Sequence, residues 1–155
     1  MTSAPKGSRS VSRVMIGVPT LGTVRIEWAN AMQAVVIPCN WGNSYQTPIN
    51  FMVDDAQNLI CYEALSKGFE WILFIEDDVI VPPNLFLVLN EYMQEKKWPI
   101  VSGLYRLKGS VPEPLVYRGR GNGAFKKFKL GDKVQVDGVP TGCLLIHSEI
   151  GRAHV

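Results

Sequence analysis

The residues best suited to chemistry are three consecutive acids, Glu76, Asp77 and Asp78, enclosed by apolar residues. An apolar run over 71–75 precedes them and another over 79–81 follows. Neighbouring carboxylates repel one another, and burial of the flanking residues takes away part of their hydration. A divalent cation relieves this repulsion, and hard oxygen ligands suit Mg²⁺ or Mn²⁺. The pattern therefore predicts a metal site, with a solvated junction between strand and loop as the alternative.

The apolar run before the acids predicts a buried strand, so the cluster is expected where that strand ends. Side chains alternate along an extended chain, which puts Glu76 and Asp78 on one side and Asp77 on the other. In open α/β sheets, ligands bind outside the carboxyl ends of the strands. The acids are therefore expected at a ligand-binding edge of a sheet.

The chain ahead of the acids is predicted to form one strand and two helices. The apolar run over 14–18 indicates a buried strand. Thr23 is expected to cap the first helix, which Pro38 stops. Asp54 is expected to open the second helix, with Gln57 three residues on as in a capping box.

The alternation of strands and helices predicts an α/β fold, with a largely parallel sheet covered by helices on both faces. Gly68 is expected to end the second helix. After the acids, two prolines precede apolar residues at helical spacing. The remaining expected elements are an ordered loop over 39–51, a helix over 85–93, strands over 100–104 and 139–146, and a C-terminal β-hairpin over 125–137 around Gly131.

Composition limits the class of protein. Sixteen basic and fourteen acidic residues give a net charge of +2, too small to indicate a nucleic-acid partner. Three cysteines without C-x-x-C spacing indicate reduced thiols in a cytoplasmic protein and no zinc site. No stretch reaches the roughly 18–20 apolar residues of a transmembrane segment. We expect a disordered tail over 1–12, one domain over 13–149, and a non-native tail over 150–155.

Four segments in order resemble the family 2-like glycosyltransferases of the GT-A fold. Leu73–Val79 is similar to the D-x-D segment of that family, and Asp55–Asn58 to the helix that precedes it. Gly17–Thr20 resembles the family's first strand end, where the nucleotide base and ribose are held. Thr141–Ile146 resembles the strand that lines the sugar and acceptor side.

The resemblance implies a GT-A, Rossmann-like fold that transfers a sugar from a nucleotide-diphosphate donor to an acceptor hydroxyl, with Mn²⁺ or Mg²⁺ as cofactor. It implies Asp78 and Glu76 as metal ligands, and Thr141 and Gly142 on the acceptor and sugar side. The donor-binding residues it implies are Pro19, Thr20, Asp55, Asn58, Glu76 and Asp77.

The chain departs from the family pattern at several positions. Glu76 stands where the first Asp is usual, and Gln57 stands where an Arg is usual. No second strand is visible between Pro38 and Asn50. The family's catalytic base lies downstream of Ile146, while residues 150–155 look like a translated sequencing adapter. We therefore expect a truncated fragment that lacks its base; the nucleotide, sugar, acceptor and stereochemical outcome stay open.

Other side chains have two interpretations each. Trp41 and the neighbouring Tyr45 could stack on a base or a sugar. Arg106 could meet a phosphate or be solvated, and the lysines of 126–133 could attract an anionic acceptor or a lipid surface, or simply be solvated. His147 has no visible partner and is interpreted as structural. The tryptophans expected in the core are Trp28 and Trp71.

Two other functions fit the acids and the alternating elements. A nucleotidyltransferase also uses an α/β sheet with acidic metal ligands, but it would show a Gly-rich loop bearing Lys or Arg after the first strand. Residues 19–23 contain one glycine and no basic side chain, which counts against it. A non-catalytic carbohydrate-binding or virion-associated module with the same fold is the other alternative.

Overall fold

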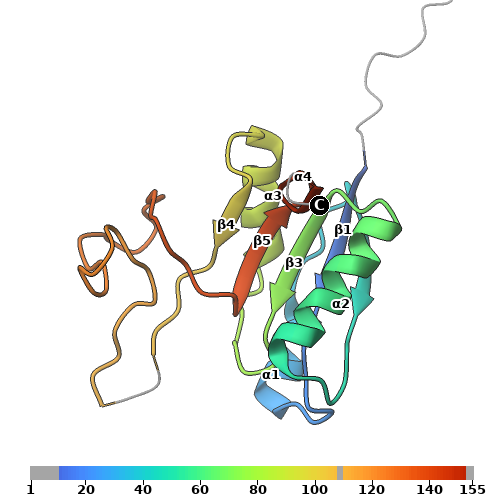
Figure 1. Ribbon diagram of the computed structural model, residues 1–155, viewed down its shortest axis with the longest axis horizontal. Helices are drawn as coiled ribbons and strands as arrows, with labels where there is room; N and C mark the ends of the chain where they lie inside the picture. The colour runs from blue at the N-terminus through green and yellow to red at the C-terminus, as the bar shows by residue number, and fades with distance from the viewer. Residues whose placement is uncertain (1–10, 108–109, 153–155) are drawn as a thin grey trace, which may run out of the picture.

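The protein is a sheet of five strands with helices packed on it, as the computed structural model in Figure 1 shows. The structure describes residues 11–107 and 110–152. The strands are β1 (Ser12–Gly17), β2 (Trp41–Gln46), β3 (Trp71–Ile75), β4 (Ile100–Ser102) and β5 (Cys143–His147). The helices are α1 (Ile26–Ala34), α2 (Val53–Ser66), α3 (Leu85–Glu95) and α4 (Ser148–Arg152).

The sheet is mixed, with the strand order β2-β1-β3-β5-β4. The strands β2, β1 and β3 are parallel, whereas β5 runs antiparallel to both of its neighbours, β3 and β4. The predicted α/β class is confirmed. The antiparallel strand β5 lies inside the sheet, between β3 and β4, so the sheet is mixed and not largely parallel as expected. As a result β3 and β4 end, and β5 begins, at the same edge of the sheet.

Both faces of the sheet are covered, which explains the continuous apolar runs of its central strands. On one face α1 and α3 pack over alternate strand residues such as Ile16 and Leu73. On the other face α2 packs over the intervening residues, with Ile60 against Met15 and Phe74. Figure 1 shows α2 in front of the sheet and α3 behind it. No helix within residues 11–107 and 110–152 is long and apolar enough to cross a bilayer.

The predicted helix caps are wrong at both N-termini. The first helix begins after Arg25 and not at Thr23, and the second begins after Met52, without a side-chain cap from Asp54. Asp54 lies instead in the first turn of α2, where its charge complements the helix dipole. The predicted end of α2 is confirmed, since Gly68 follows it with φ of 69°.

The loop predicted over 39–51 is wrong, because it contains β2. This strand pairs with β1 in register from Ser12 to Gly17. It lies at the edge of the sheet, and of its six side chains only that of Trp41 is buried. Backbone pairing at an edge needs no apolar alternation, so the polar sequence of β2 carried no strand signal.

The hairpin predicted over 125–137 is also wrong. The structure has no strand within residues 125–137, and isolated bridges from Tyr117 to Ala124 and to Gly138 flank this region. A tight turn does form at 129–132, where Gly131 has φ of 93° and the Asp132 carboxylate accepts the Lys129 N–H. The turn residues were therefore correctly identified, while the alternating residues on either side pair with other partners.

Candidate functional site at the carboxyl edge of the sheet

The three acids follow β3 immediately, at the edge where the parallel strands end. The chain turns there, since the N–H of Val79 donates to the carbonyl of Glu76 at 3.1 Å. Glu76 and Asp77 are half-buried and Asp78 is exposed. The extended alternation expected through Asp78 is therefore wrong, because the strand stops at Ile75.

The backbone of Glu76 is held from two further elements. Its N–H donates to the carbonyl of Gly142 at 3.0 Å, just ahead of β5. Its carbonyl accepts the indole N–H of Trp28 at 3.0 Å, from α1. Trp28 is half-buried. Its hydrogen bond links α1 to the acids, and its side chain also packs against the core. These two hydrogen bonds fix the backbone position of Glu76.

The side chain of Glu76 meets the segment that precedes β5. Its carboxylate oxygen Oε1 accepts a hydrogen bond from the hydroxyl of Thr141 at 3.1 Å. The structure thus brings Glu76 together with two residues assigned to the sugar and acceptor side, Thr141 and Gly142. Glu76 and Thr141 are 65 residues apart in sequence. The contact exists because β5 returns antiparallel beside β3.

Tyr105 belongs to the same cluster, although no sequence motif predicts it. Its hydroxyl oxygen accepts the N–H of Gly142 at 2.7 Å. Burial raises the pKa of Tyr105, and the nearby carboxylates Glu76 and Asp78 raise it further, against a lowering by the Gly142 hydrogen bond. Its phenolic proton is therefore retained at neutral pH. The only signal in the sequence was its place just after a predicted strand.

Gly142 allows this close approach because it has no side chain. A Cβ there would lie 2.5 Å from the Tyr105 hydroxyl oxygen and 3.0 Å from a methyl carbon of Val79. Both distances are shorter than ordinary carbon contacts. The glycine thus lets the acid turn, the end of the 103–105 segment and the start of β5 pack together.

The residues predicted to hold the donor lie near this edge but form no single cluster. Pro19 is buried and Thr20 half-buried, just after β1, the neighbour of β3. Backbone bonds of Thr20 to Pro48 and Asn50 fix this loop.

Asp55 and Asn58 are exposed on the first turns of α2, on the opposite face from α1 and α3. Within the described ranges, no hydrogen bond links either of them to Glu76 or Asp77. The cluster therefore comprises the acids, Thr141, Gly142 and Tyr105.

The donor atoms at the acids are hard oxygens, which suit Mg²⁺ or Mn²⁺. Among the residues that the structure describes, no three His, Cys, Asp or Glu side chains gather to enclose a metal ion. The acids therefore do not form a cage made of protein ligands alone. They fit a cation held by one or two carboxylates, with its remaining ligands from water and phosphate oxygens, as is usual for Mg²⁺.

Trp41 does not lie in a binding site. It is buried, its ring stacks on Phe86 with centroids 5.2 Å apart, and its indole N–H donates to Asn90 at 2.8 Å. The interpretation of Trp41 as a stacking platform for a base or sugar is therefore wrong. Its neighbour Tyr45 is 48% exposed, and Trp71 is buried as predicted.

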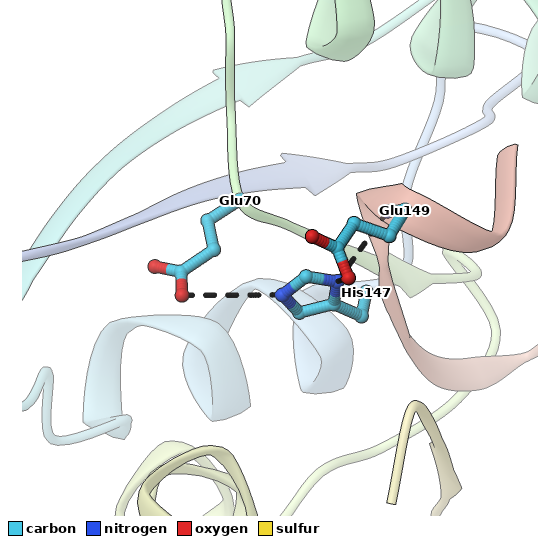
Figure 2. Close-up of polar contacts among 3 residues, drawn as sticks. All are labelled: Glu70, His147 and Glu149. Atoms are coloured by element: carbon cyan, nitrogen blue, oxygen red, sulfur yellow. Dashed lines mark hydrogen bonds and ion pairs between the residues drawn. The ribbon is translucent and has the colours of Figure 1, made fainter. Parts of the chain in front are cut away.

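His147 has partners that the sequence did not reveal. Figure 2 shows its imidazole between Glu70 and Glu149, with nitrogen–oxygen distances of 3.9 and 3.8 Å. Its ring also meets the edge of Trp71 at a centroid distance of 4.6 Å. The histidine ends β5, so it lies at the opposite edge of the sheet from the acids. It joins the start of β3 to the start of α4.

Comparison with known proteins identifies the fold alone. No family model matches the chain, and no curated protein matches it. Among solved structures, the crystal structure of A197 from STIV matches with a TM-score of 0.61 and 20% sequence identity. The match covers 88% of this chain and 65% of A197, so the chain spans less than two thirds of that protein's length. The chain is therefore similar to A197 from STIV in its mixed α/β fold.

Proposed function

We propose that the chain is the donor-binding part of a GT-A glycosyltransferase that uses a nucleotide-diphosphate sugar. The observation that carries this proposal is the meeting of Glu76 with Thr141 beside Asp77 and Asp78, directly after a central parallel strand. Four sequence segments resemble that family in order, and three of them end or begin at this edge. Ligands of open α/β sheets bind at such an edge.

In this proposal the three acids contact different parts of the donor. Asp78, the most exposed acid, would hold the Mg²⁺ or Mn²⁺ that accompanies the diphosphate. The bound cation would neutralise the charge that develops on the leaving diphosphate. Asp77 and Glu76 bind the ribose or share the cation, and Tyr105 directs its hydroxyl proton toward the phosphate oxygens.

The loop after β1 and the start of α2 complete the donor pocket in the proposal. Pro19 and Thr20 follow the strand next to β3, so they border the acids from the side of β1. Asp55 and Asn58 face solvent at the start of α2, where a nucleotide extending beyond the acids can meet them. Thr141 borders the sugar.

The reaction breaks the bond between the anomeric carbon and the diphosphate oxygen, and forms one to the acceptor oxygen. The acceptor hydroxyl gives its proton to a general base. The residues assigned above bind the donor and stabilise the leaving group. None of them is assigned the role of base.

Calorimetric titration of UDP and of GDP into the purified chain tests the proposal. We expect binding with Mn²⁺ that disappears in EDTA and in Asp78→Asn. The matched control is Glu91→Gln, which neutralises an exposed carboxylate on α3 and should bind the nucleotide normally. Absence of nucleotide binding by the folded wild-type protein would overturn the proposal, as would binding that ignores both metal and Asp78.

A further inference from the structure

A cavity of about 630 Å³ lies between the edge strand β4 and the segment that connects it to β5. Its volume is within the range of roughly 300–1,000 Å³ typical of small-molecule sites. Most of its wall is apolar. The apolar side chains that line it include Trp98, Leu104, Phe125, Phe128 and Val136. Figure 1 shows the connecting segment lying to the side of β4, away from α2.

The cavity wall also contains main-chain hydrogen-bonding groups. The N–H of Gly103 donates to Cys143, and the N–H of His147 donates to Pro99. Because bonding alternates along an antiparallel pair, the main-chain groups of Ile100 and Ser102 point away from β5. That direction is the open edge of the sheet, where both residues line the cavity.

A second, more open hollow adjoins the first, and Phe125 and Asp137 line both. Its other lining residues include Arg118, Lys126 and Lys127. The guanidinium of Arg118 lies over the ring of Phe125, 4.9 Å from its centroid. The ring of Phe125 is therefore a wall shared by the apolar cavity and the more open, basic hollow.

The connecting segment is strongly basic. Residues 118–133 contain six Lys or Arg and one Asp. Only two of the six have ion-pair partners among the residues that the structure describes, Lys126 with Glu113 and Lys133 with Glu95. The acid at the boundary, Asp137, is engaged by the N–H of Gly119 at 2.8 Å. The segment therefore keeps an excess of positive charge over the more open hollow.

We propose that this two-part cavity binds an amphipathic anion with a single apolar tail. The tail lies along β4 between Trp98, Leu104 and Phe128, and a phosphate or carboxylate head contacts Arg118 and Lys127. Charged oxygen groups suit guanidinium and ammonium donors, while the apolar wall excludes a fully hydrated ligand.

The location of the cavity suggests what this ligand is for. Leu104 and Leu144 line it, and the residues next to them in sequence, Tyr105 and Cys143, border the acid cluster. A bound amphiphile therefore lies beside the proposed donor site. If this amphiphile is the glycosyl acceptor, it must carry a hydroxyl on the part of the ligand that lies beside Leu104; this role rests on the proposed function, whereas the binding does not.

Tryptophan fluorescence tests the cavity, because Trp98 is half-buried in its wall. The probe is dodecyl phosphate below its micelle concentration, compared with dodecyl maltoside and with inorganic phosphate. We expect a saturable change with dodecyl phosphate, binding of dodecyl maltoside weaker by about tenfold, and no change with inorganic phosphate. Trp98→Phe should remove the optical change and weaken the binding that calorimetry measures, because Trp98 forms part of the apolar wall.

Two pairs of variants separate the compartments. Leu104→Asp should abolish binding, whereas Leu130→Asp, at a leucine 94% exposed and outside both hollows, should leave it intact. Lys127→Gln should weaken binding about fivefold, since a charge-assisted hydrogen bond is lost. Lys129→Gln, in the same segment but outside both hollows, should not.

Four results would overturn the inference: no binding of dodecyl phosphate, equal binding of the uncharged detergent, equal effects in each variant pair, or binding only to anionic vesicles. The last would indicate a membrane-facing surface instead of a cavity. Binding of dodecyl phosphate without any nucleotide binding would keep the cavity and overturn the glycosyltransferase. Nucleotide binding without amphiphile binding would remove only the acceptor class.

Discussion

The hydroxyl oxygen of Tyr105 accepts the backbone N–H of Gly142 at a distance of 2.7 Å. This bond joins the segment that follows β4 to the segment that precedes β5. The strand β5 pairs with β4 on one side and with β3 on the other. The acid turn lies against the same contact, since Glu76 donates its N–H to the carbonyl of Gly142. Gly142 is therefore bonded through both its N–H and its carbonyl.

Gly142→Ala should lower the free energy of unfolding by about 1–3 kcal/mol, the usual cost of overpacking a filled site. The new methyl group would lie 2.5 Å from the Tyr105 hydroxyl oxygen. Gly138→Ala is the matched control, because its methyl group would meet Tyr117 at an ordinary 3.5 Å. Urea denaturation of both variants measures the difference, and equal stabilities would show that the Gly142 contact is not tight.

Thr141→Val should affect ligand binding more than stability. Its hydrogen bond to Glu76 is solvent-exposed, so its loss should change the unfolding free energy by less than about 1 kcal/mol. If Glu76 contacts the donor, an unanchored carboxylate should weaken metal-dependent nucleotide binding several-fold. Thr141→Ser keeps the hydroxyl and should bind as the wild type does. Normal binding by Thr141→Val with loss of binding in Thr141→Ser would point to the methyl group instead.

Asn90→Ala should destabilise the fold by about 1–3 kcal/mol, because it removes the partner of the Trp41 indole N–H and of the part-buried Asn40 amide. Asn90 accepts from Trp41 at 2.8 Å and exchanges two hydrogen bonds with Asn40. Gln94→Ala, at an exposed position on the same helix, is the control and should change stability little. The emission of Trp41 should shift in Asn90→Ala alone; an unchanged melting curve would contradict the prediction.

The three cysteines should react with a thiol reagent in the order of their burial. Cys39 is exposed and should react first, and Cys61 more slowly because burial raises its pKa. Burial raises the pKa of Cys143 to about 11, so it should react only on unfolding. Timed labelling with mass spectrometry at pH 8 measures the order, and early labelling of Cys143 would contradict it.

The same thiol gives stability a pH dependence. The folded pKa of Cys143 lies above the ordinary value of 9.0, so the unfolded state loses this proton first as the pH rises. The contribution to stability is complete below pH 9 and is lost as the pH rises toward about 11. Cys143→Ala should flatten this part of the profile, and an unchanged slope in that variant would assign it to other groups.

Burial on both faces decides which strands the sequence reveals. The strand 71–75 was predicted with the bounds that the structure has, because helices cover both of its faces and select an unbroken apolar run. The edge strand β2 went unseen because its hydrogen bonds to β1 are backbone bonds. The direction of β5 was also unpredictable, since it depends on how the chain between 103 and 142 returns to the sheet.

Most residues of the candidate site were predictable from the sequence, but Tyr105 and the contacts among the residues were not. Glu76 and Thr141 were each identified from local sequence, yet their hydrogen bond requires β5 to lie beside β3. Tyr105 follows a three-residue strand and carries no local motif, so only the tertiary fold brings it to Gly142. The predicted N-terminal caps of α1 and α2 were wrong because a helix can also begin without a hydrogen bond from a capping side chain, as both of these helices do.

The chain leaves the sheet after β4 and re-enters it at β5 from the same edge, beside the acids. The two attachment points stay fixed by strand pairing whatever lies between them. The excursion can thus lengthen, shorten or change its side chains while the helices and the buried strands keep their places. If the cavity binds the ligand proposed for it, substitutions in this excursion should change which ligand binds while the acids that follow β3 keep their position.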